Sequence, residues 1–415
     1  MSLLDPAGHV GSLAALSQFR TDFHDCLTGR ADALFELTDA VLCTDGPVRT
    51  LVGLALAPEH RRGHGALYAG LNRGRIDFER LRRTVAGLPL PRAVDGRLVL
   101  AADVSPWLRP DANTSPDRSF CHTYGRGKNE HKMIPGWPYS VIAALEVGRT
   151  SWTALLDAVR LEPGADAAAV TTVQVREVVE RLMSAGQWKA GDPDILLVLD
   201  AGYDVQRLSF LLADLPLELL GRLRSDRVMR RPTPPRVYAP KGGRPPKHGG
   251  EFVFGQPDTW GEPDVRTTTE TSRYGTAVAT AFDRLHPRLT RRWSRPKLRS
   301  PEAADRWTWL VIAAHTQLRL VRGLAADLRR PWERPAPPNK LTPARVRRGF
   351  RNLRTAVGSP AGAPKPTKAG PGRPPGLKNR RPAAVRDVGR VLKTGEPYSR
   401  PAHHKQGTKP RRVSD

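Results

Sequence analysis

Two aspartates end the two most strand-like runs of this sequence. The stretch "RLVLAADVSPW", residues 97–107, runs apolar up to Asp103, and "ILLVLDAGYD", residues 195–204, runs apolar up to Asp200. A buried strand directs its side chains into the core, but its carboxyl end opens to solvent, where α/β proteins commonly bind ligands. If the two strands are neighbours, we expect the two carboxylates to share one site, about 4 to 8 Å apart. Either aspartate alone could instead cap a turn.

Such a pair points to a particular chemistry. Carboxylate oxygens are the ligands that Mg²⁺ prefers, and Mn²⁺ is an alternative. Two aspartates and a third acid can hold two divalent cations, which clamp the attacking and leaving oxygens of a phosphodiester. The pair therefore predicts metal-dependent chemistry on phosphodiesters, with Asp103 and Asp200 as both catalytic and metal-binding residues.

The elements that must position the pair lie in residues 93–230. The helix expected at 171–188 has one apolar stripe, formed by Val175, Val178, Val179, Leu182 and Met183. Before it come candidate strands at 97–103, 139–147 and 151–161; after it come a strand at 194–200, a helix at 205–215 and a strand at 217–224. The order strand, strand, strand, helix, strand, helix, strand predicts an α/β core.

Residues 1–92 have a helical pattern. Near their end, two helical segments flank "GLNRGRID", where Asp77 can cap the second helix. Two helices on a tight turn with basic residues, Arg73 and Arg75 among them, are typical of a helix-turn-helix on DNA. An ordinary helical hairpin with a solvated basic face explains the pattern equally well.

The chain after residue 230 changes in composition. Residues 231–294 contain Pro- and Gly-rich stretches and a Thr-rich segment that predicts β-strands, and residues 295–330 contain one long helix of the core. Residues 331–415 hold 21 Lys and Arg against 4 Asp and Glu, with 15 of the 39 prolines. This composition predicts a basic, largely disordered tail.

The net charge indicates the partner. The chain carries 67 Lys and Arg against 41 Asp and Glu, a net of +26, and nucleic acid is the usual polyanion for such a protein. Only three cysteines occur, without a CxxC pair, and we expect neither a signal segment nor a membrane span. These features predict a soluble protein of a reducing cytoplasm.

Two copies of the tetrapeptide Gly-Arg-Pro-Pro also carry basic residues. They lie in "KGGRPPKHG" and "GPGRPPGLKNRRP" and contain Arg244 and Arg373. An extended segment of this kind can lie along an A·T-rich minor groove. A plain linker is the other explanation.

The sequence resembles the DDE transposases of bacterial insertion sequences, from residue 30 to about 355. The matching pieces are "AADVSPWLRP", "SFCHTYGRGKNEHKMIPGWPYSVIAALE", "LLVLDAGYD" and "TSRYGTAVATAF". The resemblance implies a ribonuclease-H-like core with a late β-rich insertion, which residues 231–294 would form in a shortened version. In that core, Asp103 and Asp200 are the first two acids and bind Mg²⁺. The basic segment with His122, Arg126, Lys128 and Lys132 lies near the active site, where these side chains can contact DNA phosphates; a solvated loop explains the segment almost equally well.

The resemblance also implies an activity and partners. It implies hydrolysis at transposon ends and attack of the freed 3′-hydroxyl on target DNA. The partner is then double-stranded DNA, a homodimer is allowed, and no membrane is involved. Such a protein is expected in the bacterial cytoplasm, associated with the nucleoid.

The sequence departs from the family pattern at the third acid. In these transposases it is a Glu on a helix after the β-rich insertion, yet here "GTAVATAFDRLHPRLTRRWS" passes at once into "RPKLRSPEAADRWTW". Glu302 opens the following helix, where capping explains it, and Glu270 lies inside a strand-like run. Three hypotheses stay open: an active transposase, a DNA-binding remnant that cannot cut, and a general Mg²⁺-dependent nuclease.

Overall fold

One mixed sheet carries both aspartates in the computed structural model, which describes residues 6–44, 50–124, 131–148, 150–223, 227–233, 248–271, 275–287, 302–330 and 333–364. Its strands pair in the order β4-β5-β3-β7-β8, and β6 also pairs with β5. The strands are β3 (Val99–Leu108), β4 (Ser119–Tyr124), β5 (His131–Leu145), β6 (Thr153–Arg160), β7 (Ile195–Leu199) and β8 (Leu217–Gly221). β3, β7 and β8 are parallel, whereas β4, β5 and β6 pair antiparallel. The α/β core is therefore confirmed.

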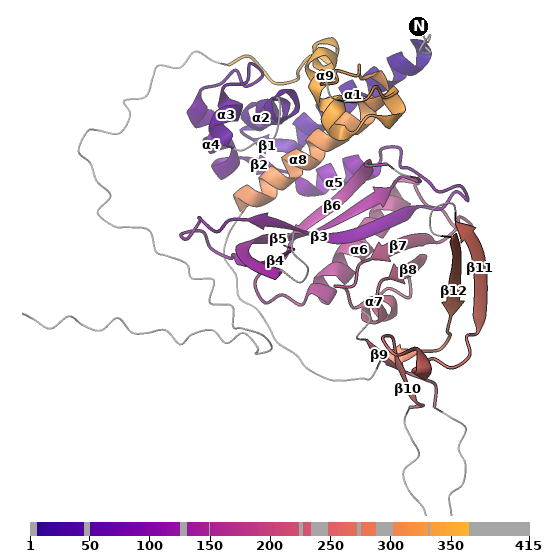
Figure 1. Ribbon diagram of the computed structural model, residues 1–415. Coiled ribbons are helices and arrows are strands. Elements are labelled where there is room, and N and C mark those ends of the chain that lie inside the picture. The colour runs from indigo at the N-terminus through magenta and orange to yellow at the C-terminus, as the bar shows by residue number, and fades with distance from the viewer. Residues whose placement is uncertain are drawn as a thin grey trace, which may run out of the picture.

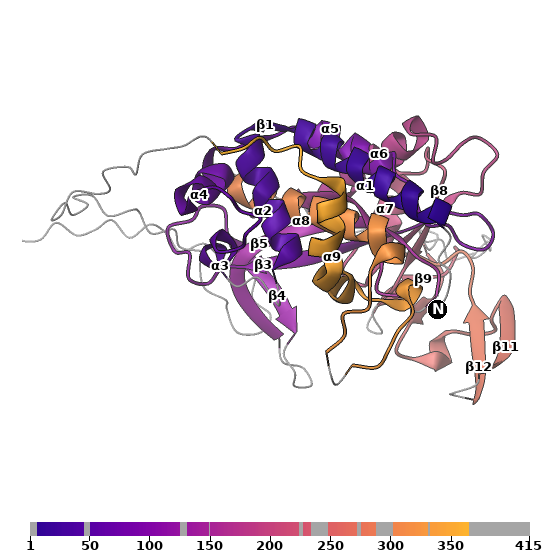
Figure 2. The same cartoon turned by 90° about the horizontal axis from the view of Figure 1, so that it is seen from above.

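Two helical layers cover the two faces of this sheet (Figure 1). α6 (Ala167–Ser184) and α7 (Val205–Leu211) lie on one face, where α6 packs its valine stripe against buried strand residues such as Leu100 and Leu197. On the other face lie α5 (Phe78–Ala86) and α8 (Glu302–Val321), which share a core cluster with Ala158 of β6. Seen from above, α1, α2, α8 and α9 overlie the sheet (Figure 2).

The strands differ from the expected ones at two places. β3 continues through Pro106, beyond the strand expected at 97–103; since β7 pairs with β3 only as far as Ala102, one edge of β3 is open there and a proline fits. Between the strands expected at 97–103 and 139–147, the chain forms β4 and the first part of β5, which pair from Ser119 to Tyr124. The sequence did not predict these strands because polar residues, Pro and Gly interrupt the alternation of apolar and polar residues.

The N-terminal region contains four helices among the described residues before α5. It contains α1 (Pro6–Cys26), α2 (Ala31–Cys43), α3 (Leu51–Ala55) and α4 (His64–Arg73). The link between α4 and α5 contains β2 (Arg75–Ile76), which pairs antiparallel with β1 (Leu27–Gly29), so the two helices are joined through a small ribbon. Asp77 caps α5 as predicted, since its carboxylate accepts a hydrogen bond of 2.9 Å from the Arg80 N–H.

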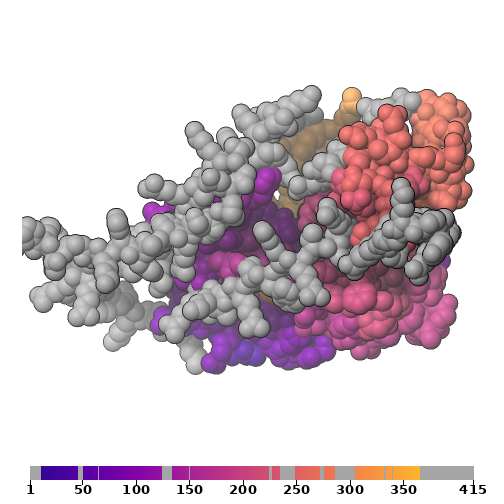
Figure 3. Space-filling model, turned by 90° about the horizontal axis from the view of Figure 1, so that it is seen from below, coloured from indigo at the N-terminus to yellow at the C-terminus, as the bar shows by residue number. Residues whose placement is uncertain are grey.

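The described part of residues 231–294 contains short strands. β9 (Val228–Arg230), β10 (Glu251–Val253) and β13 (His286–Pro287) form one small sheet, and a short 3₁₀ turn, η1, spans Pro257–Thr259. β11 (Val265–Thr271) and β12 (Gly275–Ala281) form a hairpin whose side chains are exposed along almost its whole length. Seen from below, this insertion stands at one end of the molecule (Figure 3).

The expectation of a disordered tail from residue 331 is wrong for residues 333–364. A 3₁₀ turn, η2 (Arg322–Leu324), follows α8. Residues 333–364 then contain a second turn, η3 (Pro338–Lys340), and a helix, α9 (Pro343–Val357), in which Val346 and Phe350 are fully buried. The arginines of this helix pair with acids far away in the sequence, as Arg351 does with Glu59. Composition counted these arginines as excess charge because it could not show their partners. Residues 365–415 lie outside the described residues.

Candidate active site

The two aspartates lie at adjacent strand ends. The parallel ladder between β3 and β7 ends with Ala102 opposite Leu199, so Asp103 and Asp200 are the next residues of the two strands. Residues at matching positions of a parallel pair point to the same face of a sheet. Here that face is the one opposite α6, because the neighbouring Ala102 and Leu199 are buried against α6. The predicted adjacency of the two strands is confirmed; the separation of the carboxylates stays a prediction.

Local hydrogen bonds hold both carboxylates. Asp103 Oδ1 accepts a hydrogen bond of 2.7 Å from the Val104 N–H, and Asp200 Oδ1 accepts one of 2.8 Å from the Gly202 N–H. A Cβ at Gly202 would lie 3.1 Å from the same Asp200 oxygen, so the turn suits glycine. Both aspartates are exposed to solvent. They offer hard oxygen donors on one face, which is a donor set that fits Mg²⁺ or Mn²⁺.

A half-buried tyrosine, Tyr203, interacts electrostatically with both aspartates. Burial raises the pKa of Tyr203 to about 12, and the negative charges of Asp103 and Asp200 contribute to the rise. Both carboxylates therefore act on the same phenol, which agrees with Asp103 and Asp200 lying close together. Its hydroxyl is buried near Ser140 of β5 and stays neutral at physiological pH.

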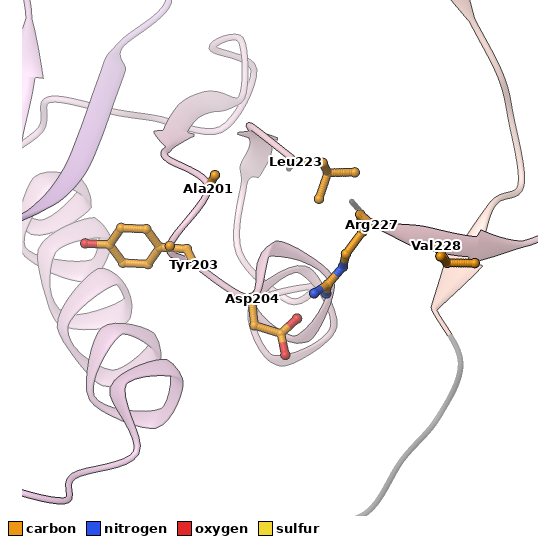
Figure 4. Close-up of a pocket in the computed structure, with 7 residues that line it drawn as sticks. Ala201, Tyr203, Asp204, Leu223, Arg227 and Val228 are labelled. Carbon is orange, nitrogen blue, oxygen red and sulfur yellow. The ribbon is translucent and has the colours of Figure 1, made fainter. Parts of the chain in front are cut away.

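A hollow of about 410 Å³ opens beside Asp200 and is lined by Ala201, Gly202, Tyr203, Asp204, Leu223, Arg227 and Val228. In Figure 4, the Tyr203 ring extends away from Asp204 and Arg227, so the polar side chains of the hollow are those two. Asp204 begins α7 and caps it by accepting a hydrogen bond from the Arg207 N–H. The hollow is therefore lined by the turn that follows Asp200 and has one side chain of each charge.

No third acid completes the pair within the described ranges. In that part of the chain, no three His, Cys, Asp or Glu side chains lie close enough together to hold a metal ion. Glu270 lies in β11, exposed, and accepts a hydrogen bond of 2.6 Å from Thr276 Oγ1. Glu302 begins α8, but its side chain lies outside the described residues. The segment 288–301, which joins the insertion to α8, contains no Asp or Glu.

Of the seven cations predicted to contact DNA, the structure describes the side chains of two. Arg73 ends α4 and Arg75 lies in β2, and both are exposed. Lys132 lies in β5 opposite Thr123, but its side chain is not among those described. Arg126, Lys128, Arg244 and Arg373 lie outside the described residues. DNA contact by all seven stays a prediction.

The comparisons with known proteins agree with this geometry. The family model described as "DDE superfamily endonuclease" matches residues 22–288. The chain belongs to the DDE superfamily endonucleases. No curated protein matches it.

The match covers the sheet, both aspartates and most of the insertion, and membership implies a DNA substrate. Nucleases of this superfamily generally use divalent metal ions, which agrees with the oxygen donors of the pair. In the described part of the chain, no helix is both long and apolar enough to cross a membrane.

Sequence analysis missed one functional candidate at this site, Arg222. The ladder between β7 and β8 ends with Leu199 opposite Gly221, so Arg222 is the counterpart of Asp200 on the next strand. The signal was present in "LELLGR", where a strand-like run ends on a charged residue. A metal site is indicated by acids, so a cation at a strand end does not stand out in the sequence.

Proposed function

We propose that this protein is a transposase-type DDE protein that binds double-stranded DNA but cuts it poorly or not at all. Its core presents Asp103 and Asp200 to a divalent cation. We infer the loss of cleavage from segment 288–301, which has no Asp or Glu where the resemblance places the third acid. The DNA would be the ends of an insertion sequence, as the resemblance implies. An active transposase and a general nuclease remain alternatives, and both require a third acid that the described residues do not show beside the pair.

The residues of the site would have two roles, cation binding and phosphate contact. Asp103 and Asp200 would hold the cation through the carboxylate oxygens that their backbone hydrogen bonds leave available. When bound, such a cation stabilises charge that develops on a phosphodiester. Arg73 at the end of α4 and Arg75 in the β1–β2 ribbon would add phosphate contacts. A homodimer stays a prediction.

The acid pair is expected to account for most Mn²⁺ binding. Asp103→Ala and Asp200→Ala should each weaken Mn²⁺ binding by more than about tenfold, because each removes half of the donors. Electron paramagnetic resonance of free Mn²⁺ measures the affinity. Glu218→Gln is the control, since it removes an exposed carboxylate from the same face of the sheet, at the start of β8. Equal Mn²⁺ binding by all four proteins would contradict the cation site.

Residues 365–415 are expected to add phosphate contacts. They hold 14 Lys and Arg against 3 Asp and Glu. Truncation after Pro364 should weaken DNA binding and make the dependence of log affinity on log salt shallower, because fewer counterions are released. Fluorescence anisotropy between about 50 and 200 mM salt gives the slope. A truncation after Arg330 would not test this, because it also removes α9 and its buried Phe350. An unchanged slope would exclude DNA contact by this segment.

A further inference from the structure

Three charged residues form a row along the ends of three adjacent parallel strands. Asp103 follows the last β3–β7 pair, Asp200 follows β7, and Arg222 follows β8. The Arg222 N–H donates a hydrogen bond of 3.1 Å to the Leu199 carbonyl, so the ladder still fixes the backbone at this position. Since neighbouring strands lie about 4.8 Å apart, the Arg222 backbone lies about that far from the Asp200 backbone.

The side chain of Arg222 lies on the same face as the two carboxylates. Along β8, Leu217 and Leu219 pack into the core that contains α6, while Leu220 is 57% exposed on the opposite face. Gly221 faces the side of the sheet that α6 and α7 cover, because a Cβ there would lie 2.1 Å from Val205 Cγ2 of α7. By alternation, Arg222 shares the exposed face with Leu220 and with the acid pair.

Arg222 is available to a ligand. It is exposed, and the ion pairs and side-chain hydrogen bonds found within the described ranges do not include its guanidinium. At the other end of the same face the situation differs, because Arg97 is bound there by Glu218 at 2.5 Å. A guanidinium presents a planar fork of donors that matches a phosphate, often with two parallel hydrogen bonds.

We propose that Arg222 binds a DNA backbone phosphate immediately beside the acid pair. The inference rests on the proposed function, because it places DNA against this face of the sheet. Two exposed carboxylates alone repel a phosphodiester, and a cation on the adjacent strand offsets that repulsion where the DNA must approach most closely. Arg222 is thus a positioning residue for the substrate, and its ligand is a phosphodiester irrespective of base sequence.

The test compares full-length Arg222→Ala, Arg222→Lys and Lys189→Ala with the unmodified chain in DNA binding. Lys189→Ala removes the same unit of charge from an exposed residue in the loop before β7, at the opposite end of the sheet. A single lost phosphate contact should weaken binding about tenfold at low salt and reduce the salt slope by about 1 for Arg222→Ala. Arg222→Lys should keep the slope and lose part of the affinity, because it keeps the charge but not the fork. Lys189→Ala should change neither by more than about twofold.

Each result decides the question. Two duplexes of unrelated sequence should lose affinity equally for Arg222→Ala, and a loss confined to one of them would overturn the phosphate assignment in favour of a base contact. An Arg222→Ala protein that matches Lys189→Ala would overturn the inference while leaving the proposed function intact. Failure of the unmodified chain to bind any DNA would overturn the proposed function itself. Equal thermal melting of the variants checks that the fold is kept.

Discussion

Incubated in Mg²⁺ or Mn²⁺ with DNA that carries its own element's ends, the unmodified protein is expected to bind at micromolar or tighter affinity at low salt and to leave the strands intact. Asp103 and Asp200 can still bind a cation, but a two-metal site that lacks its third acid loses a ligand, and its charge balance suffers. Active-site residues that act as a unit are strongly non-additive, so the loss of one commonly costs several powers of ten in rate.

The comparison that decides this uses the double variant Asp103→Ala and Asp200→Ala. Cleavage by the unmodified chain should not exceed that of the double variant, when both are measured on end-labelled duplex by denaturing gel. Cleavage that depends on the pair would show that a third acid exists. Glu302→Gln and Glu270→Gln would then be the first variants to examine, because both acids lie in or beside the region where the resemblance places it. In that event the remnant hypothesis is wrong.

The core of the site was predictable because its signal is local. A short apolar run that ends on a carboxylate marks both a buried strand and its open end, so the positions of Asp103 and Asp200 followed from a few residues each. The same rule applied to "LELLGR" would have found Arg222. β4 and the first part of β5 were not predictable in this way, because His131, Pro135 and Gly136 interrupt any alternation of polar and apolar residues.

Ion pairs between residues distant in the sequence were the second feature that could not be predicted from the sequence. The cations of α9 resembled those of a disordered tail because composition does not show which carboxylate a cation contacts. In the structure, Arg354 binds Asp39 and Arg348 binds Glu333, so these charges stabilise packing instead of binding a partner. Excess charge computed from sequence therefore overestimates what is free for DNA in residues 333–364.

Replacement of Asp39 is expected to destabilise the helical region more than that of any exposed acid. Asp39 of α2 is fully buried, accepts two hydrogen bonds, of 2.7 and 3.0 Å, from Arg20 of α1, and accepts a third, of 2.8 Å, from Arg354 of α9. Arg20 is only 1% exposed and also donates to Gln317 of α8. Three helices thus meet at one carboxylate, and Arg20 links it to a fourth, α8.

Asp39→Ala leaves the Arg20 guanidinium buried without its anion, and breaking a buried pair in this way costs about 3–5 kcal/mol of unfolding free energy. Urea unfolding followed by circular dichroism at 222 nm gives the change. Asp25→Ala is the matched control, because the Asp25–Arg80 pair is about half exposed and such pairs contribute about 0–1 kcal/mol. The control's loss should vanish in 1 M salt, whereas that of Asp39→Ala should persist because buried charges are screened little. A loss below about 1 kcal/mol for Asp39→Ala would mean that water reaches Arg20, and that α9 is held by its apolar contacts alone.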